Sequence, residues 1–206
     1  MVRRTRIARL FAAAVAALAV AVAGTATAGI IPASVTVTPE AGNFRWTYAI
    51  VLPTDMKLQS GDYFTIYDFG GLVPGSQFMD PQNSATGDWT GSTAKTGVVP
   101  SGLNPSDDAA IDNLTFTYNG PTIGPGSFGL GNFGAVSTVQ ASVRTDFTGQ
   151  NPQASTGLLD RNIVDTIAPA PAIAPPPPGV PEPTTMALAA LGLPFVGIAR
   201  LLRKKK

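Results

Sequence analysis

The chain has 206 residues, and it contains no cysteine and no histidine. Without cysteine there are no disulfides or thiolate nucleophiles, and without histidine there is no Ser-His-Asp triad and no histidine ligand for zinc. The formal net charge is +1, but nine of the 14 basic residues lie near the two ends. Residues 29–180 hold five basic and twelve acidic residues, a net charge of −7, which argues against a nucleic-acid partner.

The first 28 residues have the three parts of a secretory signal peptide. Four arginines precede residues 10–23, an apolar run of 14 residues, and the small residues Ala26 and Ala28 form a cleavage pattern. We predict cleavage after Ala28, so that the mature chain begins at Gly29, with the secretion translocon and signal peptidase as partners. The alternative is an uncleaved membrane helix, for which 14 apolar residues are short.

Residues 29–168 are long enough for one domain with one hydrophobic core. Short runs of β-branched and aromatic residues are separated there by Gly, Pro, Asn and Asp, a pattern typical of strands and turns. Alternating or continuous apolar residues predict strands at 34–38, 44–52, 63–69, 114–119 and 139–144. The segment 63–69 is apolar on both faces and is expected in the centre of a sheet. We therefore predict an all-β ectodomain, an antiparallel β-sandwich of jelly-roll type with roughly seven to nine strands, with a barrel as the alternative.

An oxygen-rich segment is the candidate metal site. Asp107, Asp108 and Asp112 lie close together in the sequence, and calcium takes about 6 to 8 oxygen ligands. Their spacing does not match the helix-loop-helix calcium pattern, and the alternative is a solvated turn in which aspartates bond the backbone. Asp80 and Asp88 flank a second, weaker candidate. No cofactor other than calcium is expected.

Aromatic residues offer a candidate sugar-binding surface. Trp46 and Tyr118 alternate with polar residues and are expected in the core, whereas Trp89 lies in a loop-like segment and is the best candidate for stacking on a sugar ring. The glycine-rich residues 120–134 do not open a helix after a strand. They indicate tight turns and a bulged strand rather than a phosphate site.

The C-terminal part begins with a proline-rich linker at residues 169–180. Eight prolines between residues 168 and 183 favour extended polyproline II and predict a stalk. Residues 184–202 hold a single charge, Arg200, and as a helix they would rise roughly 28 Å, close to the ~30 Å hydrocarbon core of a bilayer. We predict one transmembrane helix there, followed by a basic cluster that resists translocation. The cluster consists of Arg203, Lys204, Lys205 and Lys206.

Pro181, Glu182 and Pro183, followed by the apolar span and the basic cluster, form a three-part tail. This tail resembles the PEP-CTERM sorting signal of Gram-negative bacteria, and the resemblance covers residues 181–206 alone. It implies that an exosortase, a membrane-embedded cysteine transpeptidase-like enzyme, recognises the chain as its substrate and removes the tail near Pro-Glu-Pro. The expected route is export, then an inner-membrane-anchored intermediate, then the cell envelope surface or extracellular matrix. A simple membrane anchor is the alternative.

We therefore expect a non-enzymatic exported surface or matrix protein, which the resemblance associates with extracellular polysaccharide and biofilm. One alternative is a secreted enzyme that acts on glycans through a carboxylate pair, which needs no histidine. The other is a calcium-dependent adhesion or carbohydrate-binding module.

Overall fold

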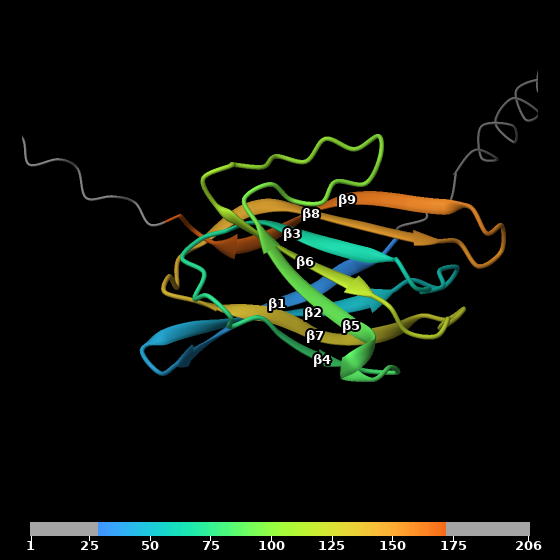
Figure 1. Cartoon of the computed structure of the whole chain (residues 1–206), viewed down its shortest axis with the longest axis horizontal. Helices are drawn as coiled ribbons and strands as arrows, with labels where there is room; N and C mark the ends of the chain where they lie inside the picture. Colours follow the sequence, from blue (N-terminus) through green and yellow to red (C-terminus); the bar gives the residue numbers. More distant parts are fainter. Residues whose placement is uncertain (1–28, 172–206) are drawn as a thin grey trace, which may run out of the picture. The chain divides into compact units, whose positions relative to one another are not determined.

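The computed structural model describes residues 29–171, which form two antiparallel β-sheets (Figure 1). In spatial order, the four-stranded sheet contains β1 (Ile31–Glu40), β2 (Asn43–Leu52), β7 (Phe128–Ser137) and β4 (Phe78–Pro81). The five-stranded sheet contains β5 (Trp89–Ala94), β6 (Asp112–Tyr118), β3 (Tyr63–Phe69), β8 (Ser142–Pro152) and β9 (Leu159–Pro169). One 3-10 turn, η1 (Thr86–Asp88), precedes β5, and residues 29–171 contain no α-helix. The predicted signal peptide and transmembrane helix lie outside the described residues.

The predicted all-β fold of two antiparallel sheets is confirmed, but the strand order departs from the jelly-roll form. The strand pairs β1–β2, β5–β6 and β8–β9 are neighbours both in sequence and within one sheet. The other consecutive strands lie in opposite sheets. Three local hairpins are therefore joined by crossings between the layers, whereas a jelly roll is built from two Greek keys.

The core between the layers is aromatic, and its centre joins β3 to β7. The ring of Phe133 on β7 lies 5.2 Å from that of Phe64 on β3, nearly perpendicular to it at 86°. Trp46 and Tyr48 on β2 are fully buried, as the alternation of residues 44–52 predicts. Edge-to-face pairs of this kind add about 0.5 to 1.5 kcal/mol to the burial of the rings. This aromatic contact holds the two sheets together.

The strand β3 lies in the centre of its sheet and is buried on both faces, which confirms the expectation for residues 63–69. Its outer face is covered by residues 95–111, the long loop drawn in light green above β3 and β8 in Figure 1. The Tyr67 hydroxyl donates to the Val98 carbonyl over 2.8 Å, and the Thr65 hydroxyl donates to the same oxygen over 3.1 Å. A Cβ on Gly97 would lie 2.4 Å from the Tyr67 ring, so glycine permits this close approach.

The strand predicted at residues 139–144 is only partly correct. The strand β7 ends at Ser137 and β8 begins at Ser142, and the chain crosses between the sheets in between. The Val139 carbonyl accepts a 3.1 Å hydrogen bond from the indole N–H of Trp46. Residues 139–141 therefore belong to the crossing segment, and only residues 142–144 of the predicted range lie in a strand.

Candidate functional site

The last described residues fix the point from which the tail extends. The strand β9 pairs with β8 as far as Pro169, the first residue of the predicted linker. The Gly70 amide donates to the Pro169 carbonyl over 3.0 Å, and the Ala170 amide donates to the Ala141 carbonyl over 2.7 Å. A Cβ on Gly70 would lie 2.3 Å from the Ala170 oxygen, so the chain end is packed against backbone. The fold therefore holds the chain up to Ala170.

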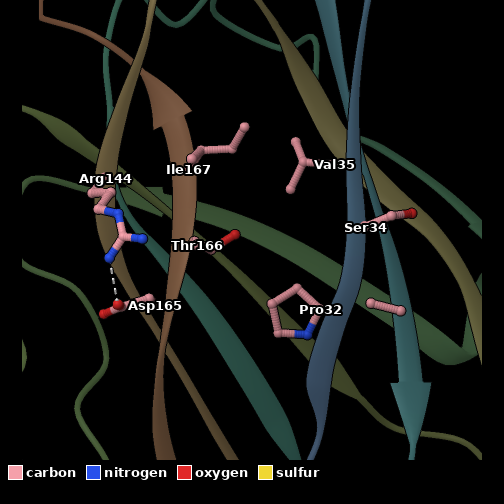
Figure 2. A pocket seen from close by; sticks show the side chains of 8 residues that line it. Pro32, Ser34, Val35, Arg144, Asp165, Thr166 and Ile167 are labelled. Atoms are coloured by element: carbon pink, nitrogen blue, oxygen red, sulfur yellow. Dashed lines mark hydrogen bonds and ion pairs between the residues drawn. The ribbon is translucent and has the colours of Figure 1, made fainter.

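An open groove lies between the edge strands β1 and β9 (Figure 2). It has a volume of about 290 Å³. Its lining comes from β1 on one side and from β8 and β9 on the other: Pro32, Ala33, Ser34, Val35, Arg144, Asp165, Thr166 and Ile167. The Arg144 guanidinium contacts the Asp165 carboxylate over 2.9 Å, and these side chains are 82% and 73% exposed. An ion pair this exposed contributes about 0 to 1 kcal/mol, so its polar groups are available to a ligand.

The carboxylate oxygens of the predicted calcium site accept hydrogen bonds from protein N–H groups or pair with a lysine. The Asp107 carboxylate accepts from the Gly97 amide over 2.9 Å and from the Asn113 side-chain amide over 2.8 Å. The Asp108 carboxylate accepts from the Ala110 amide over 2.9 Å. These contacts match the alternative of a turn in which aspartates bond the backbone.

Asp112 forms an ion pair with a lysine. Its carboxylate lies 3.0 Å from the Lys95 ammonium. In the weaker candidate, the Asp88 carboxylate accepts a 2.9 Å hydrogen bond from the Ala85 amide. Within residues 29–171, no group of three or more Asp, Glu, His or Cys residues is arranged to hold a metal ion. Calcium binding therefore stays a prediction.

Four aspartates face one another where the loop 95–111 meets the sheet. The Asp68 carboxylate accepts a 2.8 Å hydrogen bond from the Asp108 amide, and the Asp146 carboxylate accepts one of 2.6 Å from the Ser106 amide. Burial raises the pKa of the Asp68 carboxyl above its ordinary value, the Asp108 N–H opposes this, and the charges of Asp107, Asp108 and Asp146 raise the pKa further. Asp68 itself has a left-handed backbone at φ 51. These carboxylates hold the loop against β3 and β8.

The candidate sugar-stacking residue is buried, so that prediction is wrong. Trp89 is only 4% exposed, and its ring lies 4.7 Å from that of Phe133 and 5.1 Å from that of Tyr118. It belongs to the strand β5 and not to a loop. The prediction that Trp46 and Tyr118 belong to the core is confirmed, since both are fully buried.

Of the predicted signal-cleavage residues, Gly29 alone is described, and it is buried. The amide of the next residue, Ile30, donates to the side-chain oxygen of Asn151 on β8 over 2.9 Å. The other predicted sorting residues lie outside the described residues: Ala26, Ala28, Pro181, Glu182, Pro183, Arg203, Lys204, Lys205 and Lys206.

The described residues form a two-layer β protein, and a C-terminal tail follows the last strand in the sequence. Residues 179–205 of that tail match the family PEP-CTERM protein-sorting motif, and the chain therefore carries this motif. The motif marks an exported protein that an exosortase processes by way of a membrane-anchored sorting intermediate. No curated protein and no solved structure matches the chain. Within residues 29–171, no helix has the length and apolarity needed to cross a membrane.

Proposed function

We propose that this chain is a non-enzymatic surface or matrix protein, which an exosortase separates from its tail near Pro181-Glu182-Pro183 and which then associates with extracellular polysaccharide. The observation that carries the proposal is the sorting motif at residues 179–205, which follows closely on a fold that ends at Ala170. Eight residues, 171–178, separate the two, including Pro175 to Pro178, and proline-rich sequences favour an extended, solvated backbone that a processing enzyme can reach.

The mass of the protein isolated from the cell envelope tests the sorting step. We expect a chain that begins at Gly29 and ends near Pro181-Glu182-Pro183. Deletion of residues 181–206 should release the domain from the membrane without processing. Recovery of the full 21.2 kDa chain from the cytosol would overturn the proposal.

The surface proposed for the polysaccharide is the groove between β1 and β9. With Trp46, Tyr67, Trp89 and Tyr118 all buried, a stacking platform of the usual aromatic kind is not built from these residues. The exposed Arg144 and Asp165 pair instead presents a planar donor and an acceptor at the β9 side of the groove (Figure 2). Such groups suit the hydroxyls and carboxylates of an extended glycan.

Cosedimentation with exopolysaccharide purified from the producing cells tests this surface. We expect the processed protein to be retained, and the double variant Arg144→Gln with Asp165→Asn to lose most of the binding. Lys95→Gln is the matched control, because it removes a different surface ion pair, that with Asp112. Equal retention of the double variant would exclude the groove. Oligosaccharide products released during the incubation would contradict the non-enzymatic assignment.

A further inference from the structure

Two buried side-chain oxygens within residues 29–171 accept no hydrogen bond: Asp160 Oδ2 and Asn162 Oδ1. They lie two residues apart on β9, and alternate residues of a strand share one face. Leaving a buried acceptor without a donor costs about 1 to 3 kcal/mol, and more for a charged group. The Asp160 carboxylate accepts from the Arg161 amide through its other oxygen, so these two oxygens are the ones left without a donor.

The start of the mature chain lies against this site. A Cβ on Gly29 would lie 2.6 Å from Asn162 Oδ1 and 2.8 Å from Asn151 Oδ1. The side-chain amide of Asn162 donates to the Ile30 carbonyl over 3.0 Å. Asp160 is the direct cross-strand partner of Asn151, so their side chains are neighbours on one face. From the covalent geometry, the nitrogen of Gly29 is within about 5 Å of Asn162 Oδ1.

Signal-peptide cleavage changes the chemistry at this nitrogen. Water adds across the Ala28–Gly29 peptide bond, the departing peptide keeps the carboxylate, and Gly29 keeps the amine, which is mostly protonated at neutral pH. A neutral amide with one N–H becomes an ammonium with three.

We propose that the α-ammonium of Gly29 binds this pocket, where it donates to Asn162 Oδ1 and Asp160 Oδ2, so that processing completes the fold. The proposal rests on the predicted export only for the position of the cleavage.

The donor count and the charge both fit. The Ile30 amide already occupies Asn151 Oδ1, which leaves the two free oxygens for the new N–H groups. The Asp160 carboxylate supplies the opposite charge. Glycine at position 29 leaves the space that a side chain would take from the two asparagine oxygens. The folded domain is then more stable after processing than before it, which suits a precursor that crosses the membrane unfolded.

Acetylation of the amine isolates the effect. The chain from Gly29 to Lys206 is prepared in detergent with a free or an acetylated Gly29 amine, and urea unfolding of the sandwich is compared. We expect acetylation to raise the unfolding equilibrium constant about tenfold, because the charge and two donors are lost. In Asp160→Asn the same acetylation should have less than a threefold effect. The control Asp165→Asn, on the exposed pair of the same strand, should keep the full tenfold effect.

A second measurement does not depend on the variants. The α-amine of the folded wild-type chain should react with an acylating reagent several times more slowly than that of the urea-unfolded chain. Equal reactivity, or an acetylation effect that is the same in Asp160→Asn, would overturn the proposal. Sequencing of the exported chain separates it from the sorting function: a first residue other than Gly29 overturns the proposal and leaves the exosortase route intact.

Discussion

Asp62 gives the domain a pH dependence with an unusual sign. Its carboxylate accepts a 2.7 Å hydrogen bond from the Gln59 amide inside a tight turn, and the residue is 3% exposed. Burial raises the pKa of this carboxyl to about 7, although the Gln59 N–H and the nearby charge of Lys57 lower it. In the unfolded chain an aspartate titrates near 3.9.

The sign follows from where the proton binds. Between about pH 4 and pH 7 the folded chain holds a proton that the unfolded chain has lost, so the free energy of unfolding falls as the pH rises. The stabilisation is fully present below pH 4 and is lost as the pH passes 7. The full difference corresponds to ~4 kcal/mol, and we take about half of it, about 2 kcal/mol, as the expected change.

The variant Asp62→Asn keeps an oxygen for the Gln59 amide and removes the titration. We expect the wild type to lose about 2 kcal/mol relative to this variant between pH 4 and pH 8. Urea unfolding followed by tryptophan fluorescence measures it, since both tryptophans are buried. The exposed Asp165→Asn should keep the wild-type dependence. The reasoning is refuted if Asp62→Asn and the wild type change in parallel with pH.

Three further predictions concern packing and the outer loop. A Cβ on Gly134 would lie 1.9 Å from the Trp46 carbonyl oxygen, so Gly134→Ala should lower the free energy of unfolding by about 3 kcal/mol in denaturant. The control Gly87→Ala, with no atom within 4 Å of the new methyl, should change stability by less than ~0.5 kcal/mol. Tyr67→Phe removes the donor to Val98 and should cost about 1 kcal/mol and speed amide exchange in the loop 95–111; unchanged exchange would contradict the role of that bond. Chelator should leave the melting temperature unchanged, because the aspartates of the predicted calcium loop already have protein donors; a fall of several degrees would restore the calcium interpretation.

The sequence predicts the strands well where one face of a strand meets the core. Alternation placed Trp46 and Tyr118 inside, and the continuous apolar run placed residues 63–69 at a sheet centre, because these patterns reflect burial of single residues. The sequence-based prediction was wrong at Trp89, because the nearby Gly87 and Gly91 are residues typical of loops. Pairing with β6 makes that segment a strand, and such a pairing joins residues far apart in the chain.

The candidate sites were harder to predict because their partners are distant in sequence. Crowding of Asp107 and Asp108 is visible in the chain, but the donors that occupy them come from Gly97 and Asn113 as well as Ala110. The buried oxygen of Asn162 lies beside the chain start, 133 positions away in the sequence. By contrast, the sorting motif is a local string read without folding, and its prediction is confirmed by the family match.

The first and the last described residues lie at opposite ends of the β8–β9 hairpin. A Cβ on Gly29 would meet Asn162 near the beginning of β9, whereas Ala170 follows the other end of that strand. Eight residues of extended strand separate these positions, a distance of roughly 26 Å. Cleavage at one end therefore removes no contact at the other. The proposed contacts of the Gly29 amine therefore do not depend on whether the residues that follow Ala170 are still attached.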